Sequence, residues 1–214
     1  MDEPSSIQAA AQTMRVLSLL DALAAAGLVP SSSQALHELA YLANVLAPVF
    51  DLPPLNATLL KRKSGPYYPA LQQTIDHLVG RGLVEAVDLR HELDEFEKRY
   101  RICASYRLCR KQVSAALKRY RSLYATEAEF LDELAAAYSG LSDAEQGTVA
   151  VEDARYADGS VDVNNVIDFG QWATLEKNFS RNAAMAFAPG LNLAPAERLY
   201  LYLDHLHGKV AHAG

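Results

Sequence analysis

The sequence predicts a mainly α-helical protein with a small β-ribbon. Apolar residues recur at helical spacing through most of the 214 residues. One stretch, residues 61–107, instead contains a basic turn, a proline-started helix and two alternating segments, in the order of a winged helix. We therefore predict a winged-helix module packed with additional N- and C-terminal helices. We divide the chain into a winged-helix-containing domain, residues 1–108, and a helical domain, residues 109–214.

Two helices are expected before residue 61, and the second belongs to the winged-helix module, which we place at about residues 30–108. Residues 6–26 place apolar side chains on one face, and Gly27 can end that helix. Residues 34–47 carry a wider apolar face, which predicts a helix buried on much of its surface. Ser31–Ser33 can supply its N-cap. Three prolines then break the chain, and a short helical turn is expected at Asn56–Lys61.

The module itself follows from local signals. Gly65-Pro66 predicts a turn, and Pro69 suits the first turn of a helix over residues 69–80. Residues 83–89 alternate as a half-buried strand does, and residues 91–98 are expected to form a charged loop. The second strand should place on one face Tyr100, Ile102, Ala104 and Tyr106, and on the other Arg99, Arg101, Cys103, Ser105 and Arg107.

The rest of the chain returns to helical periodicity. Ser142 with Glu145 is a capping-box pattern, which predicts a helix running from there to about Tyr156. Residues 157–169 are expected to be irregular. The other predicted helices cover residues 109–125, about 126–138, 172–187 and 195–211.

Charge is distributed unevenly along the chain. The formal net charge is −6, yet residues 61–121 hold 14 of the 20 Lys and Arg and only 7 of the 26 Asp and Glu. That region therefore has a net charge of +7 and the remainder −13. A local basic region can bind nucleic acid even in an acidic protein. Charge matching within the chain or between subunits explains the same distribution equally well.

Two groups of side chains are candidates for binding nucleic acid or a partner. The first group lies on the module. Its members that should face outward and could read bases are Gln72, Gln73 and His77. Its members that could hold phosphates are Lys61, Arg62, Lys63, Arg81, Arg99, Arg101 and Arg107. The following helix adds Arg110, Lys111, Lys118 and Arg121, which could track a nucleic-acid backbone or pair with acidic residues. The predicted helix has no basic residue before Arg81, and the ribbon tip is acidic. A docking or structural role is therefore favoured over duplex binding.

Catalytic chemistry is not indicated. The sequence lacks a nucleophile elbow and a Gly-rich phosphate loop, and His205 and His207 would point apart on a helix. We predict a non-enzymatic protein with no catalytic residues, no metal site and no cofactor. The acidic amino terminus has no signal-peptide pattern, and the apolar stretch at residues 16–29 is too short to span a bilayer. We therefore expect a soluble cytoplasmic protein.

Residues 36–83 carry a family resemblance, in HELAYLANVLAPVF, PPLNATLLKRKSGPYYPAL and LVGRGLVE. They resemble the middle components of bacterial ABC three-component systems, which are encoded between an effector gene and an ATPase gene and are implicated in anti-phage defence. The arrangement YLA…GPYYPAL…RGLVE is also similar to the antitoxin-like SocA/Panacea group, and residues 152–187 fit the same pattern.

This resemblance implies an accessory or adaptor subunit that couples an SMC- or ABC-type ATPase to an effector. It leaves open whether the protein contacts double-stranded DNA and whether it forms a homo-oligomer. The alternative function is that of a winged-helix transcriptional regulator or antitoxin, which would bind a palindromic site as a dimer.

Overall fold

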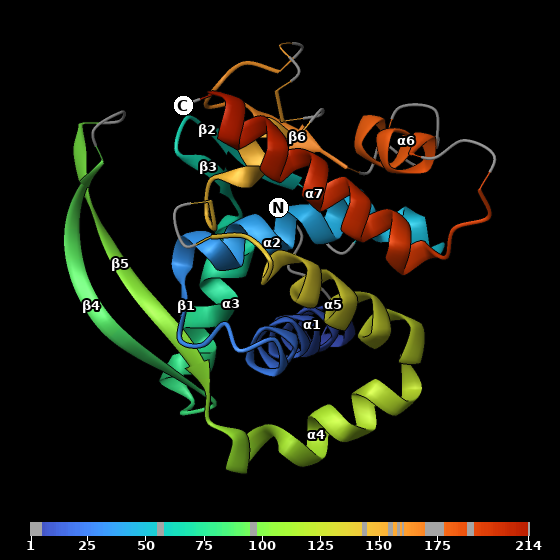
Figure 1. Ribbon diagram of the computed structural model, residues 1–214. Coiled ribbons are helices and arrows are strands. Elements are labelled where there is room, and N and C mark those ends of the chain that lie inside the picture. The colour runs from blue at the N-terminus through green and yellow to red at the C-terminus, as the bar shows by residue number, and fades with distance from the viewer. Residues whose placement is uncertain are drawn as a thin grey trace.

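The computed structural model describes residues 6–54, 58–94, 98–142, 145–153, 156–157, 159, 161–169, 178–187 and 191–213. These residues form seven α-helices, two short 3₁₀ helices and two small antiparallel sheets (Figure 1). Helices predominate, as predicted, but strands form two small antiparallel sheets and not only the expected ribbon. Among the described helices, none combines the length and apolar character that a bilayer crossing requires.

The amino-terminal part contains α1 (Ser6–Ala25), β1 (Ser31–Ser32) and α2 (Ser33–Leu46), followed by a 3₁₀ turn at Ala47–Phe50. Ser32 caps α2, because its hydroxyl accepts the N–H of Ala35 at 3.1 Å. The two-residue strand β1 was not predicted. It forms because the chain pairs with a later strand just before it turns into α2.

The prediction of a helical turn at Asn56–Lys61 is wrong for residues 58–61, the part of this range that the structure describes. Residues from Thr58 onward form strand β2 (Thr58–Arg62), which turns at residues 63–64 into β3 (Gly65–Tyr67). The other edge of β2 pairs with β6 (Val166–Asp168), and Leu59 lies buried opposite Ile167. This pairing with a distant segment selects a strand where the local sequence suggested a helical turn.

The predicted helix and ribbon are present as α3 (Pro69–Gly80), β4 (Val84–Asp94) and β5 (Arg99–Leu108). β5 lies between β1 and β4, and all three strands are antiparallel. The first strand is longer than predicted, so residues 91–94 of the expected loop belong to the ribbon. Residues 95–97 lie outside the described part. Figure 1 shows the ribbon curving away from the helices at the side of the molecule.

The carboxyl-terminal part contains α4 (Arg110–Leu123), α5 (Ala125–Tyr138), a 3₁₀ turn at Val149–Glu152, α6 (Phe179–Ala186) and α7 (Pro195–Ala213). Residues 170–177, at the start of the predicted helix 172–187, lie outside the described part.

The helix predicted from Ser142 to about Tyr156 is wrong. The N–H and hydroxyl of Ser142 do donate to the Glu145 carboxylate, at 2.8 and 2.6 Å. However, the chain then turns at Gly147, whose φ of +93° no helix allows, and the buried carboxylate of Glu38 accepts the N–H groups of Gly147 and Ala150. At Gly147 and Ala150 a tertiary contact thus takes the place of the helical hydrogen bond.

One hydrophobic core joins the two parts of the chain. Helix α2 passes through its centre, where Leu36, Leu39 and Leu42 are inaccessible to solvent. Residues from both sides of position 108, including Leu20 and Phe130, belong to the same core. The carboxyl-terminal helices therefore pack directly on the amino-terminal ones, whereas much of the ribbon extends beyond this core (Figure 1).

Candidate partner-binding groove

A groove of about 750 Å³ lies between the β4–β5 ribbon and the body of the protein. We call it the ribbon groove. Its walls are the ribbon on one side and, on the other, the start of α2 and the β2–β3 hairpin, and α3 contributes to its lining. The residues that line it include His37, Arg62, Tyr67, Gln72, Asp76, Leu89, Tyr100, Ile102 and Tyr106.

Gln72 is the centre of a polar network in the groove. Its side-chain oxygen accepts from the Ser33 hydroxyl at 3.3 Å and lies 3.3 Å from Nε2 of His37. Its amide nitrogen donates to the Asp76 carboxylate at 2.9 Å and to the Tyr106 hydroxyl at 3.1 Å. The network joins α2, α3 and β5, so Gln72 holds the base of the ribbon to the helices. Its polar groups are already occupied and do not face outward to read bases.

The protonation of His37 follows from its contacts. Nδ1 accepts the backbone N–H of Tyr68 at 3.1 Å, so the single ring proton must be on Nε2, which donates to Gln72. Burial is the main cause that lowers the pKa of His37 to about 4, and the positive charge of Arg62 lowers it further. His37 is therefore a neutral structural residue at physiological pH, as expected for a satisfied histidine.

Arg62 lines the hairpin side of the groove. Its guanidinium lies 3.9 Å from the centroid of the Tyr67 ring, within cation–π range. The ring of Tyr67 packs in turn against His37, with 4.7 Å between the ring centroids. The Tyr156 hydroxyl donates to the backbone oxygen of Arg62 at 2.6 Å, and this bond anchors the end of strand β2. This wall is thus rigid, aromatic and positively charged.

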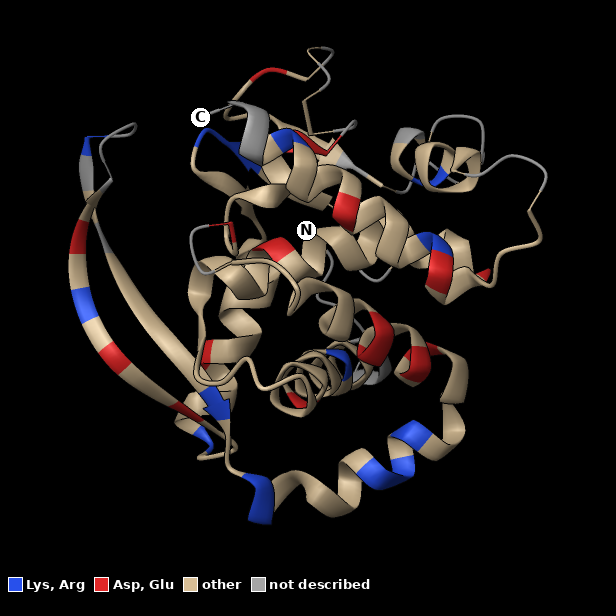
Figure 2. Cartoon of the chain, viewed as in Figure 1, with Lys and Arg blue, Asp and Glu red and all other residues tan. Residues whose placement is uncertain are grey.

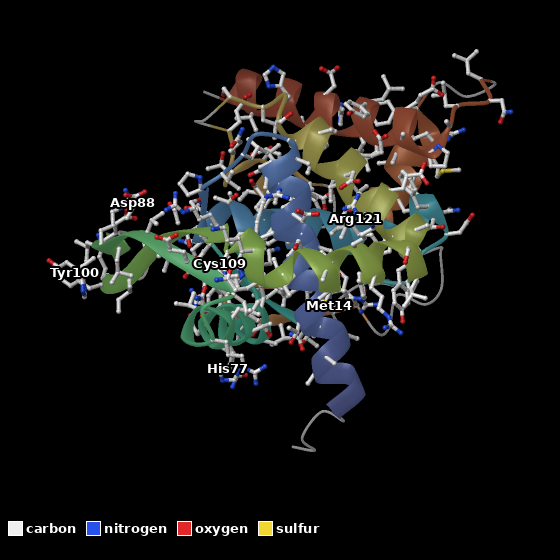
Figure 3. All side chains as sticks on the ribbon, turned by 90° about the horizontal axis from the view of Figure 1, so that it is seen from below. Met14, His77, Asp88, Tyr100, Cys109 and Arg121 are labelled. Carbon is white, nitrogen blue, oxygen red and sulfur yellow. The ribbon has the colours of Figure 1, made fainter. Side chains whose placement is uncertain are left out.

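The opposite wall exposes large apolar side chains. Tyr100, Ile102 and Leu89 are 73%, 66% and 69% exposed, and Leu93 pairs across the ribbon with Tyr100. The face shared by Ile102 and Tyr106 is the one predicted from the sequence. Tyr106 is buried at the base of the ribbon, whereas Ile102 extends beyond the core. Figure 3 shows Tyr100 at the far end of the ribbon.

The other residues of the module that were predicted to bind, where their side chains are described, lie outside the ribbon groove. Lys61 is buried: its Nζ donates to the backbone oxygen of Val161 at 2.9 Å and lies 5.6 Å from the Tyr156 ring centroid. Lys63 is exposed in the hairpin turn. Gln73 and His77 are exposed on α3, and Arg81 is exposed just after it. Figure 3 shows His77 on the outer side of that helix.

On the ribbon, Arg107 forms an ion pair with Glu85 at 2.9 Å. Arg99 and Arg101 belong to β5, but their side chains lie outside the described part. Figure 2 shows that basic and acidic residues both occur along β4, whereas basic residues follow one another along α4.

The basic helix α4 is partly neutralised by acidic residues. Arg110 pairs with Asp21 of α1 at 3.1 Å, and Arg121 pairs with Asp132 of α5 through both of its terminal nitrogens. Charge matching within the chain, one of the two predicted explanations, therefore accounts for these two arginines. Lys111 and Lys118 are exposed, with no carboxylate in ion-pairing range in the part of the chain that is described.

The twelve predicted residues whose side chains are described thus do not form one surface, and of these twelve only Arg62 and Gln72 line the ribbon groove. Four residues that line the groove were not predicted to bind: Tyr67, Leu89, Tyr100 and Ile102. The sequence shows apolar residues at alternate positions, including Tyr100 and Ile102. This pattern predicts a half-buried strand in which these two side chains face the core. Only the length of the ribbon beyond the core shows that these side chains are exposed.

Two buried carboxylates outside the groove anchor α2 to the carboxyl-terminal segments. Glu38 accepts from the N–H of Ala150 at 2.7 Å and from the Tyr138 hydroxyl. Asp153 accepts the hydroxyls of Tyr41 and Tyr202, and that of Ser180 at 2.8 Å. Both carboxylates are inaccessible to solvent. Several of these residues lie in the segments that carry the family resemblance, and their contacts here are structural.

Comparison with known proteins adds no identity: no protein-family model, no curated protein and no solved structure matches the chain. Within the described ranges, no group of three His, Cys, Asp or Glu side chains is arranged to hold a metal ion.

Proposed function

We propose that the chain is a non-enzymatic adaptor that binds a partner protein through the ribbon groove and the apolar face of the ribbon. The observation that carries this proposal is the exposure of Tyr100 and Ile102 beside a groove with an aromatic wall. Protein interfaces are rich in aromatic residues and poor in charge at their centres, and hot spots fill well-packed pockets. Three of the basic residues that would favour a nucleic-acid surface are instead buried, as is Lys61, or paired, as are Arg107 and Arg121.

The resemblance of residues 36–83 to the middle components of ABC three-component systems supports a particular class of partner. These are an SMC- or ABC-type ATPase and an effector, acting together in the bacterial cytoplasm in anti-phage defence. The adaptor would connect the two, and its rigid core would fix the orientation of the ribbon.

We also propose that the amino-terminal part is a winged-helix module. Supporting this are the chain order α1, β1, α2, α3, β4 and β5 and the position of β5 between β1 and β4. The β2–β3 hairpin would then be an insertion between the second and third helices, and it forms the wall of the groove.

The second candidate function is that of a DNA-binding regulator or antitoxin. It is favoured by Gln73, His77 and Arg81, which are exposed on or just after α3, the helix that would enter the major groove. A regulator should form a symmetric dimer and bind a short palindrome without any other protein.

Co-expression with the proteins encoded by neighbouring genes separates the two candidates. We expect the chain to elute in one complex with an ATPase, and Ile102→Glu to abolish that complex. The matched control is Leu123→Glu, since Leu123 of α4 is 68% exposed and lies outside the ribbon groove. Specific nanomolar binding of the isolated chain to a short duplex, with no complex formed, would establish the regulator instead.

A further inference from the structure

The ribbon has an open strand edge on the side of β1. β1 pairs with β5 only at Ser105 and Tyr106, because the chain leaves the sheet after Ser32 and enters α2. Over Arg99–Ile102, the described part of the chain places a strand beside β5 only on the β4 side. In an antiparallel pair, alternate residues direct their backbone N–H and C=O groups away from the partner strand. This stretch of β5 therefore presents backbone groups that another strand could bind.

The outer edge of β4 differs. A β-bulge between Val87 and Arg90 shifts the register of the ribbon there, and Asp88 has a left-handed φ of +53°. Bulges bend a strand and disrupt the regular spacing of its hydrogen-bonding groups, which is one way that proteins protect sheet edges. Beyond the bulge only residues 90–94 of β4 pair in continuous register, whereas the open edge of β5 continues the line of β1 and borders the ribbon groove. Strand addition is thus favoured on the β1 side of the sheet.

We infer that the partner supplies an extended segment that adds to the sheet as a strand beside β5, along the line that β1 leaves at Ser32. This inference rests on the proposed adaptor function and specifies how the partner binds. Main-chain hydrogen bonds to β5 provide affinity, and alternate side chains of the segment provide specificity. We expect every second residue of the segment to be apolar, since one face of the new strand continues the face of Tyr100 and Ile102.

The surroundings of the edge favour a single extended chain over a second copy of this protein. Opposite the ribbon stands the wall formed by Arg62 and Tyr67, so a strand beside β5 must lie within the ribbon groove. A second copy carries its own β5 edge inside an equal groove. A recessed edge is reached more readily by one extended segment than by the same edge of a second folded copy.

The test is hydrogen–deuterium exchange, resolved to single amides, on the chain alone and in the complex with its co-expressed partners. Strand addition should slow exchange about tenfold or more at alternate amides of Arg99–Ile102, those that do not bond to β4. Amides that already bond to β4 should change little. The Leu123→Glu variant should behave as the wild type does, because its substitution lies outside the groove.

Each outcome is informative. A complex with alternate protection along β5 supports strand addition. A complex without that protection overturns it but leaves the adaptor function intact, because the partner then binds by side chains alone. The same protection in a dimer of the isolated chain would identify a second copy as the occupant and also overturn the inference. If no complex forms, the adaptor function fails and the inference fails with it.

Discussion

Helix α2 and the β4–β5 ribbon each depart from the usual distribution of polar and apolar residues, helix α2 by burying polar side chains and the ribbon by exposing apolar ones. Helix α2 buries polar side chains: Glu38 and Asn44 have no exposed surface, and Asn44 donates to the Tyr68 hydroxyl at 2.8 Å. The ribbon exposes apolar side chains at Tyr100 and Ile102. Buried polar groups that are fully hydrogen-bonded fix one arrangement of the surrounding segments, whereas exposed apolar groups are available to a partner. Substitutions in α2 and its contacts should therefore change stability, and substitutions in the ribbon should change binding.

The largest expected effect is at the buried carboxylate of Asp153. Asp153→Ala removes the acceptor of the Tyr41, Tyr202 and Ser180 hydroxyls and leaves all three in the core. We expect the free energy of unfolding to fall by about 4 kcal/mol, measured by urea denaturation. The control Asp162→Ala, at an exposed carboxylate, should stay within about 0.5 kcal/mol of the wild type. Equal losses in the two variants would show that the buried network is not special.

The adjacent residues His37 and Glu38 should make opposite contributions to the pH dependence of stability. Burial raises the pKa of Glu38 from its ordinary value of 4.5 to about 7, although its hydrogen bonds oppose the shift. The folded chain then holds this proton more tightly, so the stabilisation is complete below pH 4.5 and is lost as the pH rises through 7. The pKa of His37 falls from 6.5 to about 4, so its contribution is complete above pH 6.5 and is lost as the pH falls through 4.

Glu38→Gln removes one of these two contributions. From pH 4.5 to 7, the stability of the variant relative to the wild type should rise by about 3 kcal/mol. Urea denaturation at several pH values measures this difference directly, and other titrating groups cancel from it. A difference that does not vary with pH would mean that Glu38 keeps an ordinary pKa when folded.

A smaller effect is expected at the polar network of the groove. Gln72→Ala breaks the contacts that join α2, α3 and β5 and should lower stability by about 2 kcal/mol. Gln73→Ala, one residue along the same helix but exposed, should change stability by less than about 0.5 kcal/mol. The pair can be compared by thermal or urea unfolding. If Gln73→Ala cost as much as Gln72→Ala, the network would not hold the ribbon in the way proposed.

The smallest effect is expected at the exposed lysines of α4. Lys111→Ala and Lys118→Ala should leave stability and partner binding nearly unchanged, because neither lysine lies in the ribbon groove. If the chain binds DNA through α4, each substitution should reduce the salt dependence of that binding by about one phosphate contact. A titration with duplex DNA at several salt concentrations measures how steeply the binding constant falls with salt. We expect this salt dependence to be the same in both variants as in the wild type.

Local signals predicted much of the fold. The helix Pro69–Gly80 matches the prediction, because a first-turn proline and a regular apolar stripe act within one segment. The face of β5 that contains Ile102 and Tyr106 was also predicted, from alternation alone. The β2–β3 hairpin was not, since β2 depends on pairing with Val166–Asp168, far along the chain. The turn at Gly147 was missed for the same reason: it depends on the carboxylate of Glu38.

The site was harder to predict than the fold. The sequence located a basic region, but it did not show which charges were already paired, as Arg110 is with Asp21 of α1. Nor did it show that the ribbon extends past the core and exposes Ile102. Pairing and exposure are properties of the tertiary structure, so residue type and spacing alone do not give them.

The most direct test of this account compares stability and partner binding in Ile102→Glu, with Leu123→Glu as the control of equal exposure. We predict that both variants unfold within about 0.5 kcal/mol of the wild type, and that only Ile102→Glu weakens the complex with the co-expressed partner, by more than about tenfold. A complex that survives Ile102→Glu unchanged, or one that both variants weaken equally, would contradict the assignment of the ribbon as the binding surface.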